Sequence, residues 1–212
     1  MGRLTRAEQA GRNRVLVLDA ARRVFLARGY HNATLEQIAD EAGFSKGVVY
    51  SQFASKADLF LALLDARIAE RAEENARLAE SLPGGDQGLL ALVGHLTAGD
   101  QLTRGWQLLV IEFRVHAARD PDLSRRYAAL HARTRQALAA VITGIHRRAG
   151  QPPPFPAEDM AQMILTVEAG IRLEQAAEPE GPEAPTAFGL LRGFPESPLR
   201  SDDGTRKAGR PR

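Results

Sequence analysis

The chain contains no cysteine among its 212 residues, which excludes a disulfide framework and a thiolate metal site. It also lacks any run of about 18 apolar residues, so we expect no membrane-spanning helix. Residues 1–14 carry charge without an apolar stretch, unlike a secretory signal. A hydrophobic fraction of 44% beside a charged fraction of 25% is typical of a soluble globular protein, which we expect in the cytoplasm.

The patterns of common catalytic and metal sites are missing as well. No glycine-rich phosphate loop follows a strand pattern, and neither a His-Glu-x-x-His motif nor a nucleophile elbow is present. Glu112 and His116 lie four residues apart on one helical face, a spacing that suits a metal or a polar ligand, although an ordinary side-chain pair is much commoner. We therefore expect no enzyme activity, no metal and no cofactor.

What the chain does have is helical periodicity, with apolar residues at steps of three and four and no strand pattern. Proline and glycine separate the helical segments at residues 83–85, 99–100, 121 and 150–154. The sequence therefore predicts an all-α fold with helices over residues 14–28, 34–42, 45–53, 56–82, 86–96, 103–119, 123–148 and 157–178. Residues 1–12 are basic and are either an arm that reaches DNA or a frayed terminus, with a helix start signal at Thr5.

Residues 34–56 predict a helix, a tight turn and a second helix. Thr34 and Gln37 form a capping box at the first helix, in which each side chain pairs with the backbone of the other. Gly43 suits the left-handed backbone that ends a helix, and Phe44 fills the angle between the two helices. This pattern is typical of a helix-turn-helix, whose second helix enters the major groove of DNA.

The outward face of the second helix has the chemistry that DNA contact requires. It presents Ser45, Lys46, Gly47, Tyr50, Ser51 and Gln52. The small residues allow close approach to base edges, while the lysine at a helix start and the hydroxyls suit phosphate oxygens. The alternative is an ordinary helical hairpin with a solvated face. Residues 1–58 carry nine Lys/Arg against six Asp/Glu, and this local excess of positive charge favours DNA.

Two runs of residues resemble the N-terminal domain of TetR-family transcriptional regulators. The run VLDAARRVFLARGY, ending at Tyr30, matches the family pattern of the first helix, and the run from Thr34 to Leu59 matches its helix-turn-helix. Ser51 and Gln52 stand where many members have Tyr and His. The resemblance implies a three-helix DNA-binding domain over residues 1–55 and a helical effector-binding and dimerisation domain over 56–194. We expect a short docked helix at residues 188–194 and a disordered tail at 195–212.

The resemblance also implies which residues meet DNA and how the reading heads are spaced. We expect double-stranded DNA to be contacted by Thr34, Ser45, Lys46, Gly47, Tyr50, Ser51 and Lys56, the last resembling the family's phosphate-contacting lysine. Two heads of a homodimer would lie roughly 34–36 Å apart or somewhat more, on a palindromic operator. The long helix from Lys56 would set that distance.

Aromatic and polar side chains among the later helices predict a pocket for a small-molecule effector. The candidates are Trp106, Phe113, His116, Tyr127 and His131, any of which could equally be plain core. The last helix is apolar on two sides, which favours a second subunit against one of them. We expect Met160, Ile164, Val167 and Ile171 at that interface; a central helix in a monomer is the alternative.

The residues and the resemblance together predict a ligand-responsive repressor that binds DNA as a homodimer. Two alternatives remain open: an activator or co-regulator with the same fold, and a helical protein-interaction module that no longer binds DNA.

Overall fold

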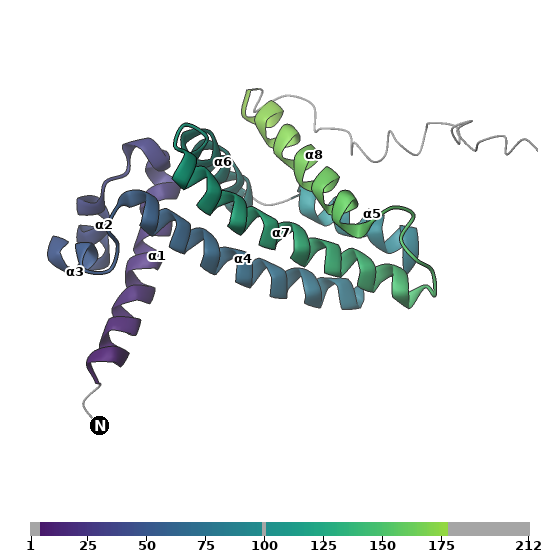
Figure 1. The fold of residues 1–212 in the computed structure, drawn as a ribbon, viewed down its shortest axis with the longest axis horizontal. Helices are drawn as coiled ribbons and strands as arrows, with labels where there is room; N and C mark the ends of the chain where they lie inside the picture. The colour runs from purple at the N-terminus through teal and green to yellow at the C-terminus, as the bar shows by residue number, and fades with distance from the viewer. Residues whose placement is uncertain (1–4, 99–100, 178–212) are drawn as a thin grey trace, which may run out of the picture.

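The computed structural model describes residues 5–98 and 101–177, so the helix expected at 188–194 and the tail expected at 195–212 lie outside the described residues. Within these ranges the chain is all-α, as predicted, without a strand (Figure 1). The helices are α1 (Arg6–Asn32), α2 (Leu35–Ala42), α3 (Lys46–Tyr50), α4 (Lys56–Ser81), α5 (Gly85–Ala98), α6 (Gln101–Ala117), α7 (Pro121–Arg148) and α8 (Ala157–Ala177).

Most predicted helix starts are confirmed at the atomic level. Thr5 and Thr34 each form a complete capping box, with Glu8 and Gln37 respectively. The hydroxyl of Ser55 accepts from the backbone N–H of Asp58 at the start of α4. These contacts satisfy backbone donors that a helix start leaves without an internal partner.

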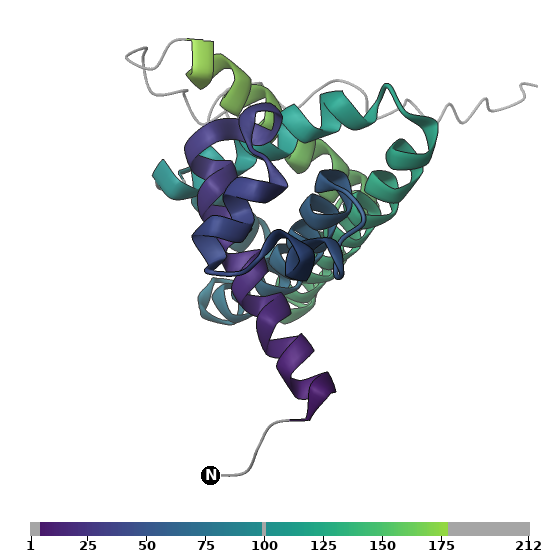
Figure 2. The ribbon, with the colours of Figure 1, turned by 90° about the vertical axis from the view of Figure 1, so that its left-hand side faces the viewer.

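Helices α1 and α3 depart by more than two residues from their predicted bounds. The box at Thr5 starts α1 at Arg6, so residues 6–12 belong to a helix and not to a separate arm. The N-terminal half of α1 projects beyond the other helices, which explains its exposed side chains (Figure 2). The second helix of the hairpin is shorter than expected, because α3 ends at Tyr50 and Ser45 makes no side-chain cap.

The body of the molecule is built on α4 and α7, which run side by side in the same direction (Figure 1). Two ion pairs with the same sequence separation fix the register of the two helices. Arg126 pairs with Asp58 at 2.5 Å, and Arg133 pairs with Asp65. Near the far end, Arg148 of α7 donates to the carbonyl of Ala79 in α4. Helices α5, α6 and α8 pack around this pair, while α1–α3 form a head at one end (Figures 1 and 2).

Two hydrophobic cores fill the fold, and the first extends across the expected boundary at residues 55/56. It joins α1–α3 to the first half of α4 through Phe25 and Phe60, and it includes Phe113 of α6 and Tyr127 of α7. The second core lies at the other end, between the last part of α4, α5, α7 and α8. The head is therefore packed against the body through a shared core rather than connected by a linker.

Among the helices of residues 5–98 and 101–177, none has both the length and the apolar character needed to cross a membrane. The same residues contain no cluster of three or more His, Cys, Asp or Glu side chains placed to hold a metal ion.

Two glycines of α5 provide a matched test of packing at the second core. A Cβ on Gly88 would overlap the carbonyl oxygen of Pro83 and lie 2.9 Å from Ile145 Cγ2, whereas a Cβ on Gly94 would meet nothing within 4 Å. Gly88→Ala should lower the free energy of unfolding by about 1–3 kcal/mol through overpacking. Gly94→Ala should raise it by up to about 1 kcal/mol through helix propensity. Urea denaturation measures both, and equal shifts would contradict this packing.

Candidate DNA-binding face and ligand cavity

The helix-turn-helix is formed by α2 and α3 in the predicted way. Gly43 adopts the left-handed conformation (φ 71°, ψ 27°), and its N–H donates to the carbonyls of Ala39 and Asp40. The chain then turns into α3, where Val49 is buried against the head core together with Phe53, which follows the end of the helix. At a positive φ a Cβ would conflict with the backbone, and glycine has no Cβ, so the tight turn depends on glycine.

The residues predicted to read DNA lie on an exposed face of the head. Thr34, Ser45, Lys46, Gly47, Tyr50 and Ser51 are all solvent-exposed, whereas Gln52 is half-buried. Their outward direction follows from the burial of Val49 and Phe53 on the opposite side of α3. Contact between these side chains and DNA remains a prediction.

Glu36 of α2, which was not among the predicted site residues, organises this face. The hydroxyl of Tyr50 donates to Glu36 Oε1 at 3.3 Å, and Lys46 Nζ lies 3.7 Å from the same oxygen. The charge of Glu36 raises the pKa of Tyr50, which keeps the phenol protonated. Since Glu36 and Tyr50 belong to different helices, no spacing in the sequence indicated their contact.

Two hydroxyls of the face already have backbone partners. Ser51 Oγ donates to the carbonyl of Val48 at 2.8 Å, and Thr34 Oγ1 accepts from the N–H of Gln37. A contact from Ser51 to phosphate would therefore require its hydroxyl to rotate away from the helix. Lys46 and Tyr50, which contact only a side chain, are freer to exchange Glu36 for a phosphate.

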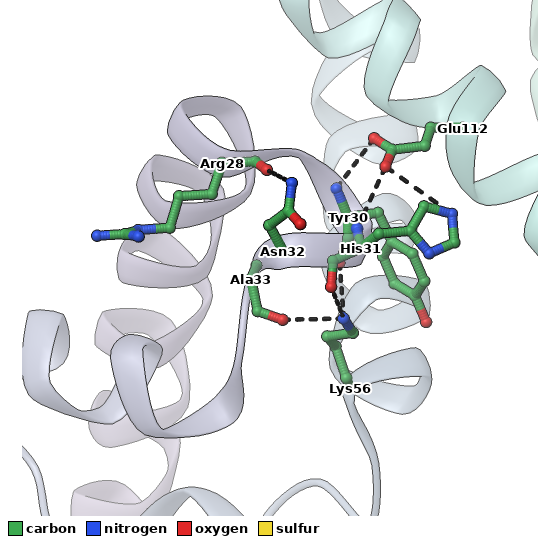
Figure 3. Close-up of polar contacts among 7 residues, drawn as sticks. All are labelled: Arg28, Tyr30, His31, Asn32, Ala33, Lys56 and Glu112. Carbon is green, nitrogen blue, oxygen red and sulfur yellow. Dashed lines mark hydrogen bonds and ion pairs between the residues drawn. The ribbon is translucent and has the colours of Figure 1, made fainter.

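Lys56 has a structural role that differs from the predicted phosphate contact. Its Nζ donates to three backbone carbonyls, those of Tyr30 (2.7 Å), His31 (3.0 Å) and Ala33 (2.9 Å) (Figure 3). An ammonium group has three N–H donors, and these bonds use them all. Burial lowers the pKa of Lys56, an effect that the nearby Glu112 carboxylate opposes. The lysine thus ties the start of α4 to the end of α1.

Glu112 of α6 holds the same segment from the other side. Its carboxylate accepts from the backbone N–H of Tyr30 at 3.0 Å and of His31 at 3.2 Å (Figure 3). Gly29 has a φ of 74° there, and a Cβ on it would lie 3.1 Å from the Glu112 carboxylate. We call this arrangement of Gly29–Ala33, Lys56 and Glu112 the joint. Glu112 and His116 do not form the metal or ligand pair that was the less common interpretation of their spacing, because the Glu112 carboxylate binds backbone amides.

An aromatic cluster beside the joint contains two residues that we had expected in the pocket. Phe113 is fully buried, with its ring 4.3 Å from Phe60 and 4.9 Å from Tyr30. His116 lies 4.9 Å from Tyr30. Neither Phe113 nor His116 lines the cavity, because both sides of α6 carry aromatic residues and these two face the head.

A cavity of about 220 Å³ lies among the helices of the body and reaches α1. Trp106, Tyr127 and His131, three of the residues expected in an effector pocket, line this cavity; their contact with an effector stays a prediction. The other lining residues come from six helices. They are Arg22 and Leu26 of α1; Leu64, Arg67, Ile68, Arg71, Ala72 and Asn75 of α4; Leu96 of α5; Leu102, Thr103, Gln107, Val110, Ile111 and Arg114 of α6; Thr134, Ala137 and Leu138 of α7; and Leu165, Glu168, Ala169 and Arg172 of α8.

The α8 wall carries buried polar groups that sequence reasoning missed. Gln107 donates to Glu168 and accepts from Arg172, which also donates to Gln175 and to the carbonyl of Thr97. Burial raises the pKa of Glu168 to about 7, although the charges of Arg71 and Arg172 oppose that shift. In the sequence, Glu168 and Arg172 are simply four residues apart on a helix, a pattern that is ordinary on a solvated face.

The predicted dimer residues of α8 need correction. Met160 and Ile164 are 5% and 2% exposed because they pack into the second core of their own chain, so they do not form an outer surface. Val167 and Ile171 are half-buried. The exposed apolar side chains of α8 are Met163 and Leu173. The sequence pattern revealed two apolar faces but not which of them the chain covers itself.

The joint yields a stability prediction. Glu112→Ala would leave the backbone N–H groups of Tyr30 and His31 without their acceptor, which should cost about 1–3 kcal/mol. Glu80→Ala is the matched control, since Glu80 is an exposed glutamate of α4. Chemical denaturation should separate the two variants, and equal stabilities would show that the joint contributes nothing.

Glu168 gives a pH prediction with a defined sign. Its carboxyl has a folded pKa of about 7 against 4.5 in the unfolded chain, so the folded state binds the proton more tightly. Its favourable contribution is complete below pH 4.5 and is lost as the pH rises to 7, on the order of 3 kcal/mol at most. Glu168→Gln should therefore lose less stability than the wild type between pH 5 and 8, while Glu174→Gln, exposed on the same helix, should behave like wild type.

Comparison with known proteins confirms the family resemblance. The profile described as bacterial regulatory proteins, tetR family, matches residues 17–63, and that of the BetI-type transcriptional repressor, C-terminal, matches residues 85–196. The transcriptional activator FasR of Mycolicibacterium smegmatis is 47% identical over 66 residues, covering 31% of this chain and 28% of FasR. The transcriptional repressor Rv1474c of Mycobacterium tuberculosis is 35% identical over 136 residues, 64% of this chain and 65% of that protein.

The chain thus spans less than two thirds of the length of these curated relatives. Among solved structures, a regulator from Saccharomonospora viridis in complex with choline shares the fold, with a TM-score of 0.67, 20% identity, and coverage of 87% of this chain and 95% of that one. Since the two profiles cover the helix-turn-helix and more than half of the chain, the protein belongs to the TetR family of bacterial transcriptional regulators.

Proposed function

We propose that this chain is a ligand-responsive transcriptional repressor that binds a palindromic operator as a homodimer. The observation that carries the proposal is the exposed face of α3, where Lys46, Gly47 and Tyr50 surround a short helix anchored by Val49 and Phe53. A helix held in this way presents side chains to the major groove while its own packing stays unchanged. We include no catalytic activity in the proposal, and we place the protein with its DNA in the cytoplasm.

The cavity supplies the regulatory half of the proposal. Its walls include α4 and α6, and both helices hold the joint, through Lys56 and Glu112 respectively. An effector that prefers one arrangement of these helices would therefore shift the head. Only a difference in affinity between the DNA-binding and the released arrangement produces such a shift.

The dimer would form through α7 and α8. Met163 and Leu173 of α8 are 46% and 51% exposed, and a second copy packed against α8 would cover this apolar surface. Exposed Ala129 and Ala140 would let α7 approach its partner closely. A symmetric dimer then matches two heads to a palindrome.

Repression is favoured over activation by two comparisons. The C-terminal profile is that of a repressor, and the relative Rv1474c is named a repressor. FasR, which matches only the N-terminal part, is named an activator, so the same head serves both kinds of regulator. Reporter transcription from the operator, measured with and without the protein, decides the direction.

The DNA-binding prediction concerns Lys46 and Tyr50. With a palindrome from the DNA next to the coding region, the wild-type dimer should bind with an affinity that falls steeply with salt. Lys46→Ala should reduce the slope of log K against log salt by about one per protomer. Adding Tyr50→Ala should weaken binding at least about tenfold further, since hydrogen bonds to charged groups are worth about 1.5–3 kcal/mol.

Arg77→Ala is the matched control, because Arg77 is an exposed cation of α4 outside the head. It should leave both the affinity and the slope unchanged. A flat salt dependence for the wild-type protein, or full cellular effect in the Lys46→Ala, Tyr50→Ala protein, would favour the protein-interaction module instead.

A further inference from the structure

The cavity has a charge imbalance that indicates its ligand class. Its lining contains five arginines and one glutamate: Arg22, Arg67, Arg71, Arg114, Arg172 and Glu168. Three of the arginines have partners already. Arg67 and Arg71 pair with glutamates of α4, and Arg172 is held by two glutamines and two carbonyls. The remaining two have no carboxylate within ion-pair distance among the residues that the structure describes.

Two residues of the cavity lining each carry a buried polar atom without a hydrogen-bond partner. These atoms are Nε of Arg22 and Nε2 of His131, from α1 and α7. A buried polar group without a partner costs about 1–3 kcal/mol, so such groups are open to a new partner. Both atoms are closed to solvent, so an oxyanion in the cavity would bond to them after a rotation of the two side chains; Arg22 Nε is a donor, and the neutral imidazole donates from Nε2 in one tautomer.

Arg114 adds a free positive charge on the same side as His131. Its charge acts on both Tyr127 and His131, and it contributes, after burial, to lowering the pKa of His131. The rings of Tyr127 and His131 stack at 6.0 Å and 11°, which fixes the direction of the imidazole. A guanidinium beside a fixed ring donor suits the flat, two-oxygen shape of a carboxylate or the oxygens of a phosphate.

The rest of the cavity suits an apolar body. Trp106, Leu26 and Val110 lie on its walls together with further aliphatic side chains of α4 and α8. Its volume of about 220 Å³ is enough for a compact organic acid. A cation would meet only Glu168, which already accepts from Gln107.

We propose that the effector is an amphipathic organic anion, whose oxyanion group binds Arg22, Arg114 and His131 while its apolar body fills the rest of the cavity. This inference rests on the proposed function, since it names the class of ligand for the same regulatory cavity. Because Arg22 belongs to α1, the ligand would contact the head directly as well as the body. Its binding would pull on the helix that ends at the joint.

Trp106 makes the test direct, because it is the single tryptophan of the chain and lines the cavity. Its fluorescence is titrated with two charge-matched series: octanoate, octanol and octylamine, then 4-phenylbutyrate, 4-phenylbutanol and 4-phenylbutylamine. Each acid should bind about tenfold tighter than its alcohol and its amine, since one charge-assisted contact is worth about 1.4 kcal/mol or more. Inorganic phosphate, added as a competitor in the acid titrations, should displace the acids only weakly.

Variants locate the anion. Arg22→Gln, Arg114→Gln and His131→Phe should each lower the affinity for the acids about tenfold and leave that for the alcohols unchanged. The phenylalanine keeps the ring that stacks on Tyr127. Arg28→Gln and Arg119→Gln are the matched controls, since both arginines are exposed outside the cavity lining on α1 and just beyond α6. They should not change the affinity for any probe.

The inference is overturned if the amines bind as tightly as the acids, if no acid binds, or if the control variants weaken acid binding as much as the cavity variants. None of these outcomes changes the salt dependence of DNA binding, which tests the proposed function separately. An amine that binds in the cavity and releases the operator would refute the anion while supporting the regulator. Loss of DNA binding in every condition would instead refute the proposed function.

Discussion

The fold depends on how the kinked end of α1 is held between two charged side chains. Gly29 interrupts the helical backbone (φ 74°, ψ 169°), and the amides and carbonyls of residues 29–33 need partners. Lys56 satisfies three carbonyls and Glu112 satisfies two amides, so charges from α4 and α6 fix the segment that connects α1 to the helix-turn-helix. Gly29 is required because its positive φ brings the backbone against the Glu112 carboxylate.

This arrangement connects the DNA-binding face to the cavity through packed side chains. The shared core of Phe25, Phe60 and Phe113 makes the head and the near end of the body a single packed unit. Packed cores move between discrete arrangements and deform little. A ligand that alters the spacing of α4 and α6 would therefore rotate the head as a rigid unit. In a dimer, this rotation would change the distance between the two heads.

Local chemistry made much of this predictable from sequence. Capping boxes at Thr5 and Thr34 and the left-handed Gly43 depend on neighbours within a few residues, and the structure has them as expected. The contacts that the sequence did not reveal join distant segments. Lys56 was expected at a phosphate, which stays a prediction, and its partners in the structure lie 23–26 residues earlier. Met160 and Ile164 share an apolar stripe, but only packing decides which face of α8 the chain covers. Arg22 gives no sign in sequence that it reaches a cavity.

The most direct test of the joint is the distance between the two heads in the free dimer. Because the chain has no cysteine, Ala54→Cys places one spin label beside α3 of each protomer. Electron double resonance should give one narrow distance distribution for the otherwise wild-type dimer and for Glu80→Ala. It should give a broader distribution for Glu112→Ala, whose heads are no longer fixed. An unchanged, narrow distribution in Glu112→Ala would contradict the central role of the joint.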